Sequence, residues 1–172
     1  MTLTRMREWV AINDEECAVI NCTKPEDVPA ILDIYTLKAQ YFRFVDTKKW
    51  DLLASLFTPD ATMFFPENQT EPADAKTTID FIIKALEGST SMHHGHMPEI
   101  EILSPDAAHG IWAIEDKIYW PSDRTTVHGI EYLHGYGHYH EDYVRVGGRW
   151  LIKTLKLTRL WVQKIAPARS VA

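Results

Sequence analysis

Three histidines, His93, His94 and His96, fall within four consecutive positions of the stretch STSMHHGHMPEI at residues 89–100. Histidine changes its charge near neutral pH and is also the commonest metal ligand in proteins. Successive side chains of a strand point to opposite faces, so His93 and His94 cannot both face one pocket. The spacing therefore predicts one histidine that can serve as a general acid or base, and it leaves a metal site open as an alternative.

Asp46 closes the segment YFRFVD, residues 41–46, where a long helix is predicted to end. The helix dipole favours cations at that end, so a carboxylate there needs a partner. One interpretation is a solvated turn aspartate. The other is that Asp46 holds one nitrogen of His93, which leaves the second nitrogen free as a base. Tyr41 could then donate a hydrogen bond to a substrate carbonyl or protonate a departing hydroxyl. This set needs neither a nucleophile nor a cofactor.

The metal alternative depends on two HxH pairs, at residues 94–96 and 138–140. Two such strands side by side could hold iron, manganese or nickel, as in a cupin-like barrel. The chain lacks the glycine-rich frame of a cupin motif, and its first half reads as helical. We therefore expect no metal, and we expect His134, His138 and His140 to lie on a polar outer face or at a subunit contact.

The elements that must position these residues change in type along the chain. Apolar residues recur at helical spacing after Pro25, and helices are expected near residues 25–47, 48–57 and 73–87, the second stopped by residues 58–60. A short strand is expected at 61–66 and longer ones at 97–103, 107–120, 127–146 and 149–164. This order predicts an α+β fold, with a cone-shaped, curved, mostly antiparallel sheet packed against N-terminal helices. Such a cone would enclose an apolar pocket with one mouth.

The size and charge of the chain limit its function classes. Its 172 residues fit one domain, which we expect at residues 25–166 between an N-terminal arm (1–24) and a C-terminal tail (167–172). The net charge of −6 disfavours nucleic acid and anionic membranes as partners. Cys17 and Cys22 form no zinc motif, and no signal peptide or membrane span is evident. A cytoplasmic location is the expectation.

Four stretches together resemble the SnoaL-like family of the ketosteroid-isomerase-like, or nuclear-transport-factor-type, superfamily, with the greatest resemblance to bile-acid dehydratase. They are residues 41–46, SMHHGHMPEI, WAIED at 112–116 and GYGHYHEDYVRVGGRWLI at 135–152, and the resemblance spans roughly residues 27–165. It implies a cone-shaped α+β barrel, elimination chemistry without a cofactor, and a homotrimer. Residue by residue, it implies a base (His93), its orienting acid (Asp46), an assisting tyrosine (Tyr41), a second pocket acid (Asp116), an arginine near the mouth (Arg159) and a further family histidine (His96).

These observations predict a cofactor-independent dehydratase that removes water from a hydroxylated carbonyl compound or thioester. The substrate would be small and hydrophobic or polycyclic, and cyclic or steroid-like. Two alternatives remain open: a double-bond isomerase that uses the same dyad, and a non-catalytic module that binds a small ligand or a partner protein.

Overall fold

The computed structural model describes residues 23–67, 69–121 and 129–166, which form three helices and one six-stranded sheet. The predicted arm, apart from its last two residues, and the predicted tail at 167–172 lie outside the described residues. No helix in the described part is long and apolar enough to cross a membrane.

The helices follow the capping and apolar signals of the sequence. A 3₁₀ turn (Pro25–Asp27) leads into α1 (Val28–Asp46), whose first turn accommodates a proline because N-terminal N–H groups need no intrahelical partner. The second helix, α2 (Trp50–Ala54), is shorter than the predicted 48–57. The chain enters a strand at Phe57, and this strand also contains residues 58–60, which were predicted to stop the helix. In α3 (Ala75–Ala85), Asp74 caps the N-terminus by accepting from the Thr77 N–H at 2.8 Å.

The strands are β1 (Phe57–Phe64), β2 (Ala73–Asp74), β3 (Thr90–Ser104), β4 (Ala107–Tyr119), β5 (Tyr132–Val146) and β6 (Arg149–Ile165). They are ordered β2-β1-β6-β5-β4-β3, and only the β1–β6 pair is parallel among the pairs of the described sheet. The expected α+β fold with a curved, mostly antiparallel sheet is therefore confirmed. The first long strand begins at Thr90, so His93 lies near its start as expected, and the strand includes all three clustered histidines as well as the segment expected at 97–103.

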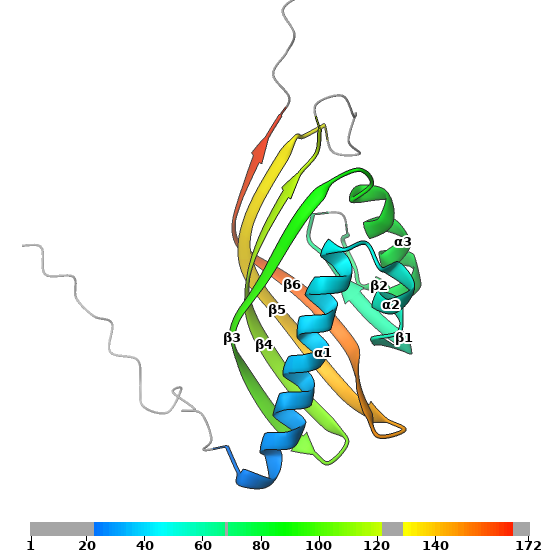
Figure 1. The fold of residues 1–172 in the computed structure, drawn as a ribbon, viewed down its shortest axis with the longest axis vertical. Coiled ribbons are helices and arrows are strands. Elements are labelled where there is room, and N and C mark those ends of the chain that lie inside the picture. Colours follow the sequence, from blue (N-terminus) through cyan, green and yellow to red (C-terminus); the bar gives the residue numbers. More distant parts are fainter. Residues whose placement is uncertain (1–22, 68, 122–128, 167–172) are drawn as a thin grey trace, which may run out of the picture.

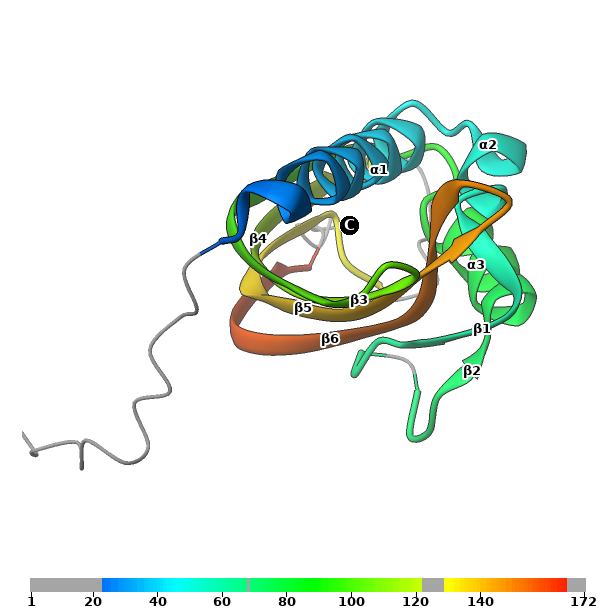
Figure 2. The same ribbon diagram turned by 90° about the horizontal axis from the view of Figure 1, so that it is seen from below.

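Helix α1 covers the concave face of the sheet, as Figures 1 and 2 show from two directions. Its buried stripe includes Ile34, Leu37, Tyr41 and Val45, which pack with the inward residues of the strands. At the contact with β3, a Cβ added to Gly95 would collide with the ring of Phe42. Glycine at this position thus lets the helix lie unusually close to the strand.

The histidines of β5 lie with the half-buried outward residues of that strand, while Leu133, Tyr139 and Tyr143 alternate with them as buried ones. His134 Nε2 is 2.7 Å from Glu115 Oε1, and His140 Nε2 is 3.0 Å from Thr158 Oγ1. Within the described ranges, no group of three or more histidine, cysteine, aspartate or glutamate side chains is arranged to hold a metal ion.

Candidate active site

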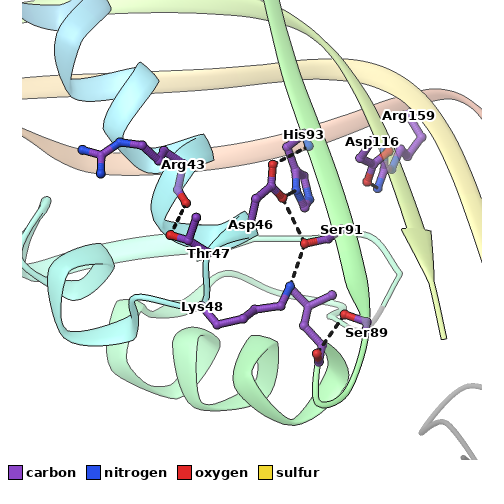
Figure 3. Close-up of polar contacts among 10 residues, drawn as sticks. Arg43, Asp46, Thr47, Lys48, Ser89, Ser91, His93, Asp116 and Arg159 are labelled. Carbon is purple, nitrogen blue, oxygen red and sulfur yellow. Dashed lines mark hydrogen bonds and ion pairs between the residues drawn. The ribbon is translucent and has the colours of Figure 1, made fainter. Parts of the chain in front are cut away.

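The imidazole of His93 and the carboxylate of Asp46 are in direct contact where the end of α1 meets β3. His93 Nδ1 lies 2.6 Å from Asp46 Oδ1, and the His93 backbone N–H donates to Oδ2 at 2.9 Å (Figure 3). An ionised carboxylate only accepts hydrogen bonds, so Nδ1 carries the proton and Nε2 has the free lone pair. The His93 side chain is 9% exposed and lines the cavity described below. The pair therefore has the arrangement of an oriented general base.

The C-terminus of α1 holds Asp46 in place through local backbone geometry. Thr47 N–H donates to Arg43 O, and Lys48 follows in the left-handed region with φ of 58°. A left-handed residue after a helix closes the last turn, although it is unfavourable for a side chain other than glycine. Lys48 Nζ donates to Ser91 Oγ at 2.6 Å, and Ser91 Oγ donates to Asp46 Oδ1 at 3.0 Å. This relay links the turn to β3.

The same contacts set the charge of Asp46. Burial by itself raises the pKa of the carboxyl, but hydrogen bonds from the His93 ring and backbone and from Ser91, with the His93 charge, outweigh burial and leave the pKa below its ordinary value. Asp46 is thus ionised at neutral pH, and it can balance the charge of an imidazolium when His93 takes a proton.

A cavity of about 110 Å³, counted as space that the centre of a water molecule can reach, opens beside His93. Its wall is mostly apolar. It includes the aromatic side chains of Phe65, Phe81 and Trp120 and the aliphatic side chains of Leu133 and Leu157. This space exceeds the roughly 10–15 Å³ needed for one water, so it can admit part of an organic ligand. Tyr41 also lines it, and burial followed by the charge of Glu141 raises the pKa of its phenol. Tyr41 therefore stays protonated and can act as a hydrogen-bond donor.

A second polar group in the cavity wall is centred on Arg159. Its Nη1 and Nη2 donate to the two oxygens of Asp116, both at 2.7 Å, and its Nε donates to Glu67. Burial disfavours the charge of Arg159, but the bonds to Asp116 outweigh it and raise the guanidinium pKa. Gly135 makes room for this pair, because an added Cβ would lie 2.6 Å from both Nη1 and Asp116 Oδ1.

Behind Tyr41 lies a buried ion pair between Lys38 and Glu141, both with fully buried side chains. Glu141 also accepts from the Tyr143 hydroxyl, which in turn accepts from Trp112 Nε1 at 2.8 Å. The ammonium is 4.0 Å from the ring centroid of Tyr41 and 4.0 Å from that of Tyr139. Both rings line the cavity, so the ion pair supports its wall from behind.

Most of the predicted site residues converge on this cavity. His93, Tyr41, Asp116 and Arg159 line it, and Asp46 contacts His93 from outside the wall. His96 does not join them. It is exposed on β3 and is absent from the cavity wall, because it lies three residues after His93 and the alternation of the strand turns it to the opposite face, with His94.

A family model for the SnoaL-like domain matches residues 26–156. The chain belongs to the SnoaL-like family. Among curated proteins, this SnoaL-like chain is 29% identical over 134 residues to the "Probable cyclase FGR4" of Gibberella zeae, covering 72% of this chain and 87% of that protein.

Solved structures share the fold of this SnoaL-like chain at low identity. A scytalone dehydratase-like protein of Novosphingobium aromaticivorans has a TM-score of 0.66 at 19% identity, covering 85% of this chain and 97% of the other. The hexachlorocyclohexane dehydrochlorinase LinA-type3 of Novosphingobium barchaimii has a TM-score of 0.66 at 19% identity, covering 86% and 97%. At this identity the similarity shows a shared fold.

Two groups in and behind the wall were not predicted from the sequence, the Lys38–Glu141 pair and Glu67. Lys38 carries a signal that could have revealed it, since it lies four residues after Ile34 and three before Tyr41 on the buried stripe of α1. A lone cation in such a stripe calls for a buried anion. Glu67 follows β1 in a turn, where the pattern of the sequence gives no comparable signal.

Proposed function

We propose that the chain is a cofactor-independent lyase that removes water from a hydroxylated, cyclic or steroid-like carbonyl compound or thioester. The observation that carries the proposal is the contact of 2.6 Å between His93 and Asp46 beside a largely apolar cavity. A general base must lie within hydrogen-bond reach of the proton that it abstracts, and His93 is part of the wall around the space that a ligand would fill. The names of the dehydratase-like and dehydrochlorinase structures, which describe eliminations, agree with this chemistry.

In the proposed reaction, His93 Nε2 takes the proton from the carbon next to the carbonyl. The electron pair of the broken C–H bond moves toward the carbonyl carbon, and negative charge develops on the carbonyl oxygen. The pair then forms the new carbon–carbon double bond as the C–O bond to the hydroxyl breaks. The hydroxyl leaves as water with a proton from His93 or Tyr41, and a Tyr41 that has donated is restored by His93.

Each of the other groups has a defined part in this scheme. Asp46 holds the reactive tautomer of His93 and balances the positive charge of its imidazolium. Tyr41 donates a hydrogen bond to the oxygen on which charge develops, a type of contact that is worth more in a water-poor cavity than in solution. Asp116 and Arg159 contact the polar part of the substrate.

A cyclase is the second candidate, and it is favoured by the name of the Gibberella zeae relative. Abstraction of the same proton by His93 would give an enolate whose carbon attacks a second carbonyl of the same molecule. An isomerase would likewise begin with this step. Mass spectrometry separates the dehydratase from the other two candidates, because dehydration removes the mass of one water from the substrate, whereas isomerisation and ring closure without loss of water leave the mass unchanged. The NMR spectrum of the product then separates ring closure from isomerisation.

The test uses a panel of hydroxylated cyclic ketones, with His94 as a matched control on the opposite side of β3 from His93. We expect His93→Ala to lower kcat by roughly 10²–10⁴-fold, the usual contribution of one positioned acid–base group, with an unchanged circular dichroism spectrum. His94→Ala should retain activity, because His94 is exposed and is not part of the cavity wall. Full activity in the His93 variant would contradict the proposal.

Proton abstraction can also be followed without a leaving group. A cyclic ketone that lacks the hydroxyl should exchange its α-hydrogens in heavy water in the presence of the protein, and more slowly with His93→Ala. A protein that binds the ketone but exchanges no hydrogen would favour the non-catalytic binding module.

We also propose that the chain forms a homo-oligomer, a trimer by family resemblance. Support comes from large apolar residues that are exposed on neighbouring strands. Tyr136 of β5 is paired with Trp161 of β6, and the adjacent Leu160 is 74% exposed, so a second copy of the chain could cover them. Light scattering coupled to gel filtration would report the mass, and a monomeric mass would contradict this part of the proposal.

A further inference from the structure

The cations near the cavity differ in how they are neutralised. Behind the wall, Lys38 is paired with Glu141, and Lys48 is linked to Asp46 through Ser91. Each of these two cations thus faces one carboxylate, and together they add no net charge to the surroundings of the cavity.

Arg159 is the exception, because its single positive charge faces two carboxylates, Asp116 and Glu67. All three side chains line the cavity, with exposures of 14% for Arg159, 4% for Asp116 and 19% for Glu67. Burial raises the phenol pKa of Tyr41 and Tyr139 in the same wall, so both stay neutral, and His93, the other ionisable member, must be neutral before the reaction if it acts as a base. The described wall therefore carries one excess negative charge in a partly desolvated space.

The hydrogen bonds of this cluster are also unbalanced. A guanidinium offers five N–H donors, and two carboxylates offer about eight acceptor sites. Three donors and three acceptor sites are used in the contacts among Arg159, Asp116 and Glu67. More acceptor sites than donors thus remain for a ligand, and hydroxyl groups are the uncharged partners that complement them.

We infer that the cavity selects an uncharged substrate that bears hydroxyl groups, and that it discriminates against compounds that would place a carboxylate or phosphate inside. This inference rests on the proposed function and narrows its substrate class. The apolar part of the wall receives the ring skeleton, the carboxylates accept from its hydroxyls, and the spare N–H groups of Arg159 donate to a carbonyl. A thioester remains compatible only when the anionic part of its carrier stays outside the cavity.

The size of the discrimination follows from Coulomb's law. An excess unit charge about 6 Å from a ligand carboxylate, at an effective dielectric constant of about 20, corresponds to a roughly 100-fold loss of affinity. Solvent at the mouth of the cavity weakens this repulsion, so we expect a difference in affinity of about 10- to 100-fold between matched neutral and anionic ligands.

Two small ligands of nearly equal shape test the inference, 4-hydroxyacetophenone and 4-hydroxybenzoate. At about pH 7.5 the benzoate carboxyl is ionised and both phenols are still mostly protonated, and this pH lies above the ordinary imidazole pKa of about 6.5, as the charge count for the wall requires. Isothermal titration calorimetry on the full chain should show the ketone binding at least about 10-fold more tightly. In Glu67→Gln the excess charge disappears. The ratio of the two dissociation constants, benzoate over ketone, should therefore fall about 10-fold through a gain in affinity for the benzoate. Glu99→Gln, a change at an exposed position of β3, is the matched control and should leave the ratio unchanged.

Three results would overturn the inference: equal or tighter binding of the benzoate, a Glu67→Gln ratio equal to that of the control, or no binding of the ketone at millimolar concentration. These results are independent of catalysis, because binding needs no proton transfer. A protein that prefers the ketone but retains full activity in His93→Ala would contradict the proposed function alone. A protein that loses activity in His93→Ala but does not prefer the ketone would contradict only the inferred substrate class.

Discussion

Replacing Lys38 by methionine tests whether the ion pair behind the cavity stabilises the fold. The change keeps an unbranched side chain, one atom shorter, that can still pack on Tyr41 and Tyr139, and it removes the ammonium. Glu141 would then be a fully buried carboxylate whose remaining described partner is the Tyr143 hydroxyl. An unpaired buried charge is one of the most unfavourable groups that a single substitution can create.

The expected cost can be worked from the burial of the pair. Removing one member of a buried ion pair lowers the free energy of unfolding by about 3–5 kcal/mol. For a chain of this length, that corresponds to a decrease in Tm of roughly 6–20 °C. Removing both charges in Lys38→Met/Glu141→Met should cost less, about 1–3 kcal/mol, since the main loss is the acceptor of the Tyr143 hydroxyl.

Urea unfolding followed by circular dichroism gives the free energies of unfolding of Lys38→Met, Glu141→Met and the double variant, and calorimetry gives their Tm values. Lys76→Met is the control, because Lys76 forms an ion pair with Asp80 on the exposed surface of α3, and its midpoint should hardly change. The reasoning would be refuted by a double variant as unstable as the sum of the two single variants, which would mean that the two charges do not interact.

Three further predictions concern the site itself. Gly135→Ala should lower the free energy of unfolding by about 1–3 kcal/mol and weaken 4-hydroxyacetophenone binding, because the new methyl group would force Arg159 and Asp116 apart; unchanged binding in calorimetry would contradict the close packing. The depressed pKa of Asp46 contributes stability that is present above its unfolded pKa of about 3.9 and is lost as pH falls through the lower folded value. Asp46→Asn should therefore flatten the dependence of unfolding free energy on pH in that acidic window, and a curve parallel to wild type would argue against the contact with His93. The same variant should lower kcat more than it raises KM, because Asp46 acts through the imidazole rather than by binding substrate; steady-state kinetics would show the opposite if Asp46 mainly held the ligand.

The helix-end carboxylate and the strand histidine could be recognised from the sequence because each violates a simple expectation. Asp46 opposes the helix dipole, and His93 lies in a strand pattern that allows only one of two adjacent histidines to face inward. The structure places them in contact.

Other features depend on tertiary contacts that local patterns do not contain. Residues 58–60 read as a helix stop, yet they lie in β1, which pairs with β6 from the far end of the chain. The interior location of Glu141 follows the inward alternation of β5, but only the fold shows that Lys38 lies opposite it. Glu67 reaches Arg159 across 92 positions of sequence, and no spacing rule could indicate that pair.

Because Gly95 has no side chain, α1 packs closely against β3, and the contact between His93 and Asp46 depends on this packing. His93 is two residues away on the same strand, and its counter-ion is carried by the last residue of α1. Separation of helix and strand by little more than an ångström would uncouple the imidazole from Asp46 while the rest of the molecule stayed folded. The proposed activity would then depend on how closely α1 packs against β3, and on heating it should be lost before the circular dichroism signal of the folded protein.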